Sequence, residues 1–122
     1  MKHRVSGRKL GRIKKQRVAL LKTLLGSLIV HERITTTEAK AKEIKPIIDK
    51  IVGKALKMHA AEGARRIAIA RYLRTKMPLV AVKKLGGEFT TRFASRQSGF
   101  VRITKTGQRA SDGARMAVIE FV

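Results

Sequence analysis

Three arginines flank a polar loop near the end of the chain. The segment TRFASRQSGFVRI (residues 91–103) contains Arg92, Arg96 and Arg102. It includes a glycine and leads into a run in which apolar and polar residues alternate. A guanidinium group offers planar, paired donors that match a phosphate, and it also stacks on exposed bases. Because loops give side chains reach, these arginines are candidates for binding an anion, with a solvated loop as the ordinary alternative.

A second candidate site is the threonine run Thr35, Thr36 and Thr37, which is followed by Lys40 and Lys42. Hydroxyl groups, free backbone N–H groups and the positive end of a helix dipole can together hold a phosphate. The same residues serve equally well as an ordinary helix N-cap. The pattern leaves both interpretations open.

The first seventeen residues, MKHRVSGRKLGRIKKQR, contain eight Lys or Arg and no acid. Such a segment cannot fold alone. Its charges repel one another, and its few apolar side chains cannot offset the conformational entropy that is lost when the segment becomes ordered. Three anionic partners fit its composition: a nucleic acid, an anionic membrane surface, or a targeting machinery that removes it. We take residues 1–12 as a basic N-terminal arm and residues 13–122 as a single domain.

The positive charge extends over the whole chain. Lys and Arg number 29 against 8 Asp and Glu, a formal net charge of +21, whereas 43% hydrophobic residues indicate that most of the 122 residues fold. A surface that repels itself this strongly is stabilised by a polyanion wrapped around several faces. The chain contains no cysteine, which excludes disulfides and thiolate metal sites.

Residues for catalysis are scarce. The histidines at positions 3, 31 and 59 lack metal-ligand spacing, no glycine-rich phosphate loop occurs, and the acids are scattered. We therefore predict no catalytic residue, no metal site, no cofactor and no small-molecule substrate. The longest apolar run, residues 18–30, contains Lys22 and Gly26 and is too short and too polar to span a bilayer, so no membrane partner is expected.

The periodicity of apolar residues predicts the first elements. Spacings of three and four predict an amphipathic helix from about Ile13 to Val30, and β-branched residues predict a short strand at residues 32–37. A second amphipathic helix follows. Its preferred N-cap is Thr37, and a capping box of Thr35 with Glu38 is the alternative.

Proline and glycine divide the middle of the chain. Pro46 falls inside the second helix, where its missing N–H predicts a kink or a break just before it. Gly63 separates this helix from a third at residues 64–74. Pro78 is expected to be the first residue of a short fourth helix that ends at Gly86.

From Phe100 onward, apolar residues recur at every second position, which is typical of strands. The runs FVRITK and RMAVIEFV flank the turn-forming segment GQRASDG, which predicts a β-hairpin with Ile119 and Phe121 facing the core, since Glu120 lies on the other face. Phe100 and Phe121 are expected in the core, so contacts to phosphate should outweigh stacking on bases. Together the elements predict an α+β, two-layer domain, with about four helices on one face of a small three-stranded sheet.

Three segments together resemble a known family: MKHRVSGRKLGR, SLIVHERITTTEAKAKE and TRFASRQSGFVRITKTGQRASDGARMAVIEFV. They are similar to the bacterial large-subunit ribosomal protein number seventeen family over nearly the whole chain. The resemblance implies a structural constituent of the cytoplasmic ribosome, bound to large-subunit ribosomal RNA and neighbouring large-subunit ribosomal proteins near the exit of the peptide tunnel. It implies no enzyme activity and no cofactor, and it favours an arm that belongs to the mature protein.

The predicted RNA-binding residues are the positions that match the family, together with basic neighbours. They are Lys2, His3, Arg4, Arg8, Lys9, Arg12, Lys14, Lys15, Arg17, Thr35, Thr36, Thr37, Lys40, Lys42, Arg92, Arg96, Arg102, Lys105 and Arg109. The alternative function is that of a nucleoid or RNA-chaperone protein that binds polyanions without a fixed site. Such a protein would form no stoichiometric complex with large-subunit particles that survives a salt wash.

Overall fold

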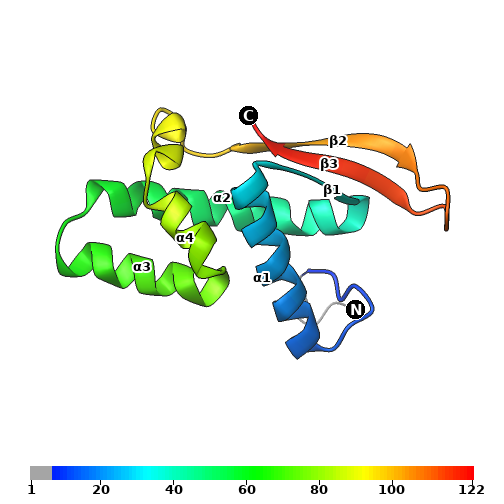
Figure 1. The fold of residues 1–122 in the computed structure, drawn as a ribbon, viewed down its shortest axis with the longest axis horizontal. Helices are drawn as coiled ribbons and strands as arrows, with labels where there is room; N and C mark the ends of the chain where they lie inside the picture. Colours follow the sequence, from blue (N-terminus) through cyan, green and yellow to red (C-terminus); the bar gives the residue numbers. More distant parts are fainter. Residues whose placement is uncertain (1–6) are drawn as a thin grey trace, which may run out of the picture.

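The computed structural model describes residues 7–122, and Figure 1 shows their arrangement. In chain order the elements are α1 (Lys14–His31), β1 (Arg33–Thr37), α2 (Glu38–Ala60), α3 (Ala64–Lys76), α4 (Leu79–Leu85), the 3₁₀-helix η1 (Glu88–Phe93), β2 (Val101–Gln108) and β3 (Arg115–Phe121). The four predicted helices and three predicted strands are confirmed. The helix η1 was not predicted.

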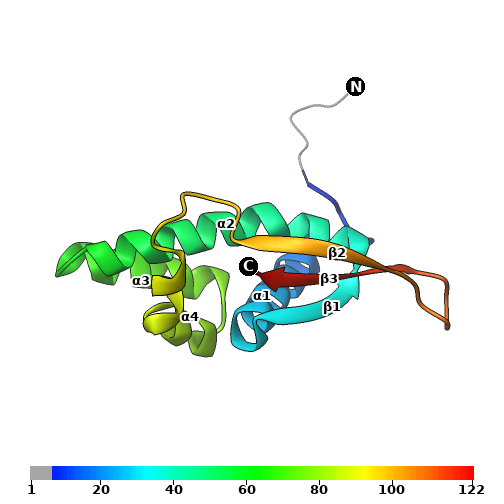
Figure 2. The same ribbon diagram turned by 90° about the horizontal axis from the view of Figure 1, so that it is seen from above.

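The three strands form one antiparallel sheet in the order β1-β3-β2, so the last strand in the chain is the central one. Ile119 of β3 pairs with Ile34 of β1 on one side and with Ile103 of β2 on the other. Figures 1 and 2 show the helices on one face of this sheet, and no helix of the described residues covers the other face. The predicted two-layer α+β architecture is confirmed.

Helix α2 contacts all three strands and is the centre of the helical layer. Its buried residues Ile44, Ile48 and Ile51 recur at helical spacing and face the sheet and the neighbouring helices. The predicted break before Pro46 is wrong, because α2 runs without interruption from Glu38 to Ala60. Pro46 lies on the exposed side of the helix, where one backbone hydrogen bond is lost while the buried residues on either side keep the helix packed.

The preferred N-cap of α2 is confirmed in its position, whereas the alternative capping box is wrong. Thr37 does occupy the N-cap position, but its side chain makes no capping hydrogen bond. It is at the same time the last residue of β1, paired with Met116, so the strand register determines its orientation. Glu38 does not complete a capping box, because its carboxylate pairs with Lys42 at 2.7 Å.

The start of α4 packs closely against α1. The helix begins at Leu79, with Pro78 as its N-cap rather than its first residue. A Cβ atom on Gly26 of α1 would lie 2.7 Å from Cδ of Pro78, closer than side-chain atoms approach one another. Glycine at position 26 therefore permits the close approach of these two helices.

All four phenylalanines form one cluster at the end of the core. Phe89 and Phe93 come from η1, and their rings lie 5.0 and 5.5 Å from the ring of Phe121, while Phe93 lies 5.6 Å from Phe100. The pairs Phe89–Phe121 and Phe93–Phe100 pack edge-to-face, which adds to the free energy of burial. The predicted core positions of Phe100 and Phe121 are confirmed, and Tyr72, with 45% of its surface exposed, is the one ring outside the core.

Burial along β3 follows the alternation of its residues only in part, because Val118, on the face away from the helices, is also only 7% exposed. Ala117, Ile119 and Phe121 are buried on the helical side, as predicted for the last two. Glu120 points to the open face of the sheet, between Arg33 and Arg102 of the edge strands, at 3.8 and 2.8 Å.

A side-chain clamp closes the turn between β2 and β3. Arg109 makes two hydrogen bonds to the carboxylate of Asp112, at 3.0 and 2.8 Å, and the N–H group of Ala114 donates to the same carboxylate. Gly113 adopts φ +70°, a left-handed conformation that favours glycine. The hydrogen bond from Arg109, followed by the one from Ala114, lowers the pKa of Asp112 to about 2.

Replacing Ile119 by Ala should lower the free energy of unfolding by about 2–5 kcal/mol, because a fully buried side chain is lost and a cavity remains. Urea denaturation measures this change. Val80→Ala is the control, because this exposed side chain should change stability by no more than about 0.5 kcal/mol. Equal effects of the two substitutions would contradict the assigned core face of β3.

Replacing Arg109 by Ala should raise the pKa of Asp112 from about 2 toward its ordinary value of 3.8. The folded-state pKa lies below the unfolded value, so the clamp stabilises the hairpin above pH 3.8 and this stabilisation is lost as the pH falls toward 2. Carboxyl-carbon NMR across this range measures the pKa. Arg115→Ala is the control, and an unchanged pKa in Arg109→Ala would show that another group holds the carboxylate.

Candidate nucleic-acid interface

The junction between α1 and β1 holds one of the predicted RNA-binding arginines. Glu32 adopts φ +62° as the C-cap of α1, and its carboxylate pairs with Arg92 of η1 and, at 3.2 Å, with Lys84 of α4. Lys84 also donates to the carbonyl group of Val30 at the end of α1. The hydrogen bond from Arg92 is the main cause of the lowered pKa of Glu32.

Arg92 also covers the aromatic cluster. Its guanidinium carbon lies 5.3 Å from the ring centroid of Phe89 and 5.4 Å from that of Phe93. A cation over an aromatic face is attracted by the ring quadrupole. Arg92 therefore fastens η1 to the α1–β1 junction, whereas the sequence pattern indicated a loop arginine that reaches toward a ligand.

The other C-terminal candidates make intramolecular contacts as well. Arg96 donates to the carbonyl of Val122 at 2.9 Å, and Arg102 pairs with Glu120. Lys105 lies 3.5 Å from Glu38, and Arg109 closes the hairpin turn. All four side chains remain exposed, so each can still present its outer edge to an anion.

The threonine run does not form a single phosphate site. Thr35 is exposed on the open face of the sheet, opposite Val118, whereas Thr36 is 9% exposed on the helical side. Glu38 occupies the first turn of α2 and pairs with Lys42, so a carboxylate already lies at the positive end of the helix. Lys40 forms no ion pair within residues 7–122.

The described part of the N-terminal arm lies beside the domain. Arg8 pairs with Glu43 of α2 at 3.1 Å, and Arg12 donates to the carbonyl of Leu10 at 2.6 Å. Arg17 donates in turn to the carbonyl of Arg12 at 3.3 Å. Lys2, His3 and Arg4 lie outside the described residues.

Several cations near the start of α1 have no carboxylate partner. Lys9, Lys14 and Lys15 are exposed, and none of them forms an ion pair with an acid of residues 7–122. An exposed ammonium group without a partner can bind phosphate without first breaking an internal contact.

A second group of such cations was missed by the sequence analysis. Helix α3 contains five Lys or Arg and no acid in its 13 residues, and all five are exposed: Arg65, Arg66, Arg71, Arg74 and Lys76. None of them pairs with a carboxylate in the part of the chain that the structure describes. The signal was the absence of acids on a helix whose only buried residue is Leu73.

Within residues 7–122, no group of three or more His, Asp or Glu side chains could hold a metal ion. None of the helices in the same range has the length and apolar character needed to cross a membrane. The chemistry that the described surface offers is the binding of anions by guanidinium and ammonium groups.

Comparisons with known proteins identify the family of the chain. Residues 20–122 match the family model described as ribosomal protein L17. The chain is 49% identical to the large ribosomal subunit protein bL17 of Thermodesulfovibrio yellowstonii, over 100% of this chain and 87% of that protein. It is 47% identical to the bL17 protein of Shouchella clausii, over 93% of this chain and 97% of that protein. The chain thus belongs to the ribosomal protein L17 family.

Proposed function

We propose that this chain is a structural constituent of the large ribosomal subunit that binds large-subunit ribosomal RNA through contacts of Lys and Arg with phosphate. Family membership supports the ribosomal assignment, since the named relatives are large-subunit ribosomal proteins. Ribosomal RNA is the polyanion that such a protein meets, and neighbouring large-subunit proteins are its further partners. A position near the exit of the peptide tunnel is part of the proposal.

The observation that carries the proposal is the number of cations in residues 7–122 that have no carboxylate partner. Of the 29 Lys and Arg in the chain, 27 lie within residues 7–122, and ion pairs in that range engage eight of these 27. Figure 1 shows α3 and the start of α1 at separate places on the helical side of the domain. Cations at both places would let RNA contact the protein at more than one point and relieve the repulsion between these cations.

The arginines that already have hydrogen-bond partners within the protein have a different role. Arg92, Arg96, Arg102 and Arg109 first hold the protein's own elements in place, and their exposed edges then add phosphate contacts. The arm of residues 1–12 adds its Lys and Arg to the cations of the domain of residues 13–122. The unpaired cations of α3 and of the start of α1 supply most of the affinity.

A nucleoid or RNA-chaperone protein without a fixed site is the second candidate, because the net charge alone would support it. The two functions differ in stoichiometry and in resistance to salt. One protein per large subunit that remains after a salt wash supports the ribosomal function. Equal binding to ribosomal RNA and to an unrelated RNA of the same length supports the alternative.

The affinity of the full chain for large-subunit ribosomal RNA should fall steeply with salt, because each phosphate contact releases counterions. With about 6–10 phosphates neutralised, the loss between roughly 50 and 200 mM salt is about a thousandfold or more. Filter binding across this range measures the slope. A flat response would contradict binding through phosphate.

Replacing Arg66, Arg71 and Arg74 by Ala should reduce the slope of log affinity against log salt by about two to three, because each phosphate contact contributes roughly 0.7–0.9. The melting temperature should stay nearly constant, because these side chains are exposed and Ala favours helix. Thermal melts and salt titrations of RNA binding measure both quantities.

The matched control replaces the same three arginines by Lys, which preserves the charge and should preserve the slope. An Ala variant with the slope of the parent would show that α3 does not face the RNA.

A further inference from the structure

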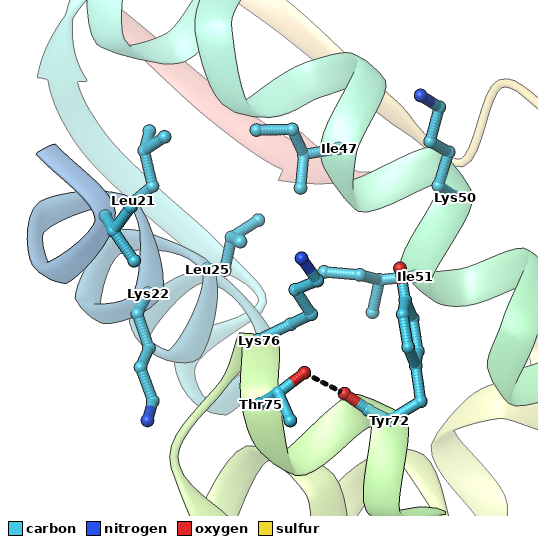
Figure 3. A pocket seen from close by; sticks show the side chains of 10 residues that line it. Leu21, Lys22, Leu25, Ile47, Lys50, Ile51, Tyr72, Thr75 and Lys76 are labelled. Atoms are coloured by element: carbon cyan, nitrogen blue, oxygen red, sulfur yellow. Dashed lines mark hydrogen bonds between the residues drawn. The ribbon is translucent and has the colours of Figure 1, made fainter. Parts of the chain in front are cut away.

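A cavity of about 320 Å³ lies between α1, α2 and α3, away from the aromatic cluster. Figure 3 shows side chains from all three helices around it. Its apolar lining consists of Val18, Leu21, Leu25, Ile47 and Ile51. Val18 is 54% exposed and Tyr72 is 45% exposed, so the mouth of the cavity is open to solvent.

The charged residues around this cavity all have the same sign. Lys22 of α1, Lys50 of α2 and Lys76 of α3 line it, and no acid does. None of the three lysines pairs with a carboxylate within residues 7–122, and all three are exposed. An apolar surface surrounded by ammonium groups suits a ligand that combines a flat apolar part with negative charge.

Tyr72 gives the cavity an aromatic wall. It is the one ring that the core does not bury, and the ammonium groups of Lys54 and Lys76 lie 5.4 and 5.7 Å from its centroid. In the same wall the hydroxyl group of Thr75 donates to the backbone carbonyl of Tyr72 at 2.6 Å (Figure 3). Exposed aromatic rings beside cations are the usual platform for an unpaired base.

We propose that this cavity receives an unpaired nucleobase of an RNA strand, with the phosphates on either side of the base held by Lys22, Lys50 and Lys76. The base packs against Tyr72 and the apolar lining, and its polar edge stays at the open mouth, where water satisfies it. This inference rests on the proposed function and adds a specific site to it. The lack of any acid at the rim favours RNA over a segment of a basic neighbouring protein.

The chain offers a single reporter for this site, because Tyr72 is its only tyrosine. Incorporating 3-fluorotyrosine into the full chain therefore places one fluorine resonance at the cavity wall. The probes are an eight-nucleotide oligoadenylate and an abasic strand of the same length, which carries the same phosphates without bases. We expect a saturable shift of the resonance with oligoadenylate and a much smaller shift with the abasic strand.

A matched pair of substitutions tests the cavity itself. Val18→Phe fills it from an exposed position, whereas Val80→Phe makes the same change at an exposed position outside the cavity lining. Val18→Phe should weaken binding of oligoadenylate by about tenfold, since one stacked base contributes about that much, and should leave binding of the abasic strand unchanged. Val80→Phe should change neither, and circular dichroism checks that both variants fold.

Three results would overturn the inference. They are equal shifts by both strands, equal affinities of the two variants for oligoadenylate, and a resonance that responds to an acidic leucine-containing peptide but to neither strand. If ribosomal RNA binding keeps its steep salt dependence in those cases, the proposed function stands without this site. Loss of ribosomal RNA binding by the parent chain would instead contradict the proposed function.

Discussion

Eight carboxylates must balance 29 Lys and Arg in this chain, and their positions determine how its elements are joined. Glu32 links the α1–β1 junction to α4 and η1, Glu120 lies between the two edge strands, and Glu38 links α2 to β2. Each of these acids pairs with at least one cation from another element, so the ion pairs reduce repulsion where those elements meet. The cations left over lie mainly on the outer surfaces of the helices.

Arginine therefore has two roles in this protein. Arg92 is held by Glu32 and by two phenylalanine rings, so its position is fixed before any ligand arrives. Arg71 belongs to a helix without acids and has no carboxylate partner in the described residues. An anion that approaches Arg71 loses nothing to internal competition, whereas one that approaches Arg92 shares it with Glu32. This difference follows from the tertiary arrangement, which brings residues 32 and 92 together.

Periodicity along the chain predicted most of the fold. Local patterns were sufficient to predict α1, α2, β2, β3 and the core face of Ile119. These patterns are the helical spacing of apolar residues and the alternation along the strands, and burial on one face imposes both. The helix η1 has no such period and is held by the phenylalanine cluster. The break predicted before Pro46 does not occur. Pro46 lies on the exposed side of α2, and the sequence alone did not reveal which side that is. The partners of Arg92, Arg96 and Arg102 lie 60, 26 and 18 residues away in the chain, beyond any local pattern.

The central position of β3 affects how the chain folds during its synthesis. Translation produces β1 and β2 before β3, yet neither edge strand has a hydrogen-bonded neighbour in the sheet until β3 arrives. Pairing of β1 with β3 also closes a loop of about 80 residues, which slows the formation of such contacts. The helices can form from local contacts in the meantime. The sheet, and with it the burial of Phe121, is therefore completed only after the segment of β3 has left the ribosome that makes it.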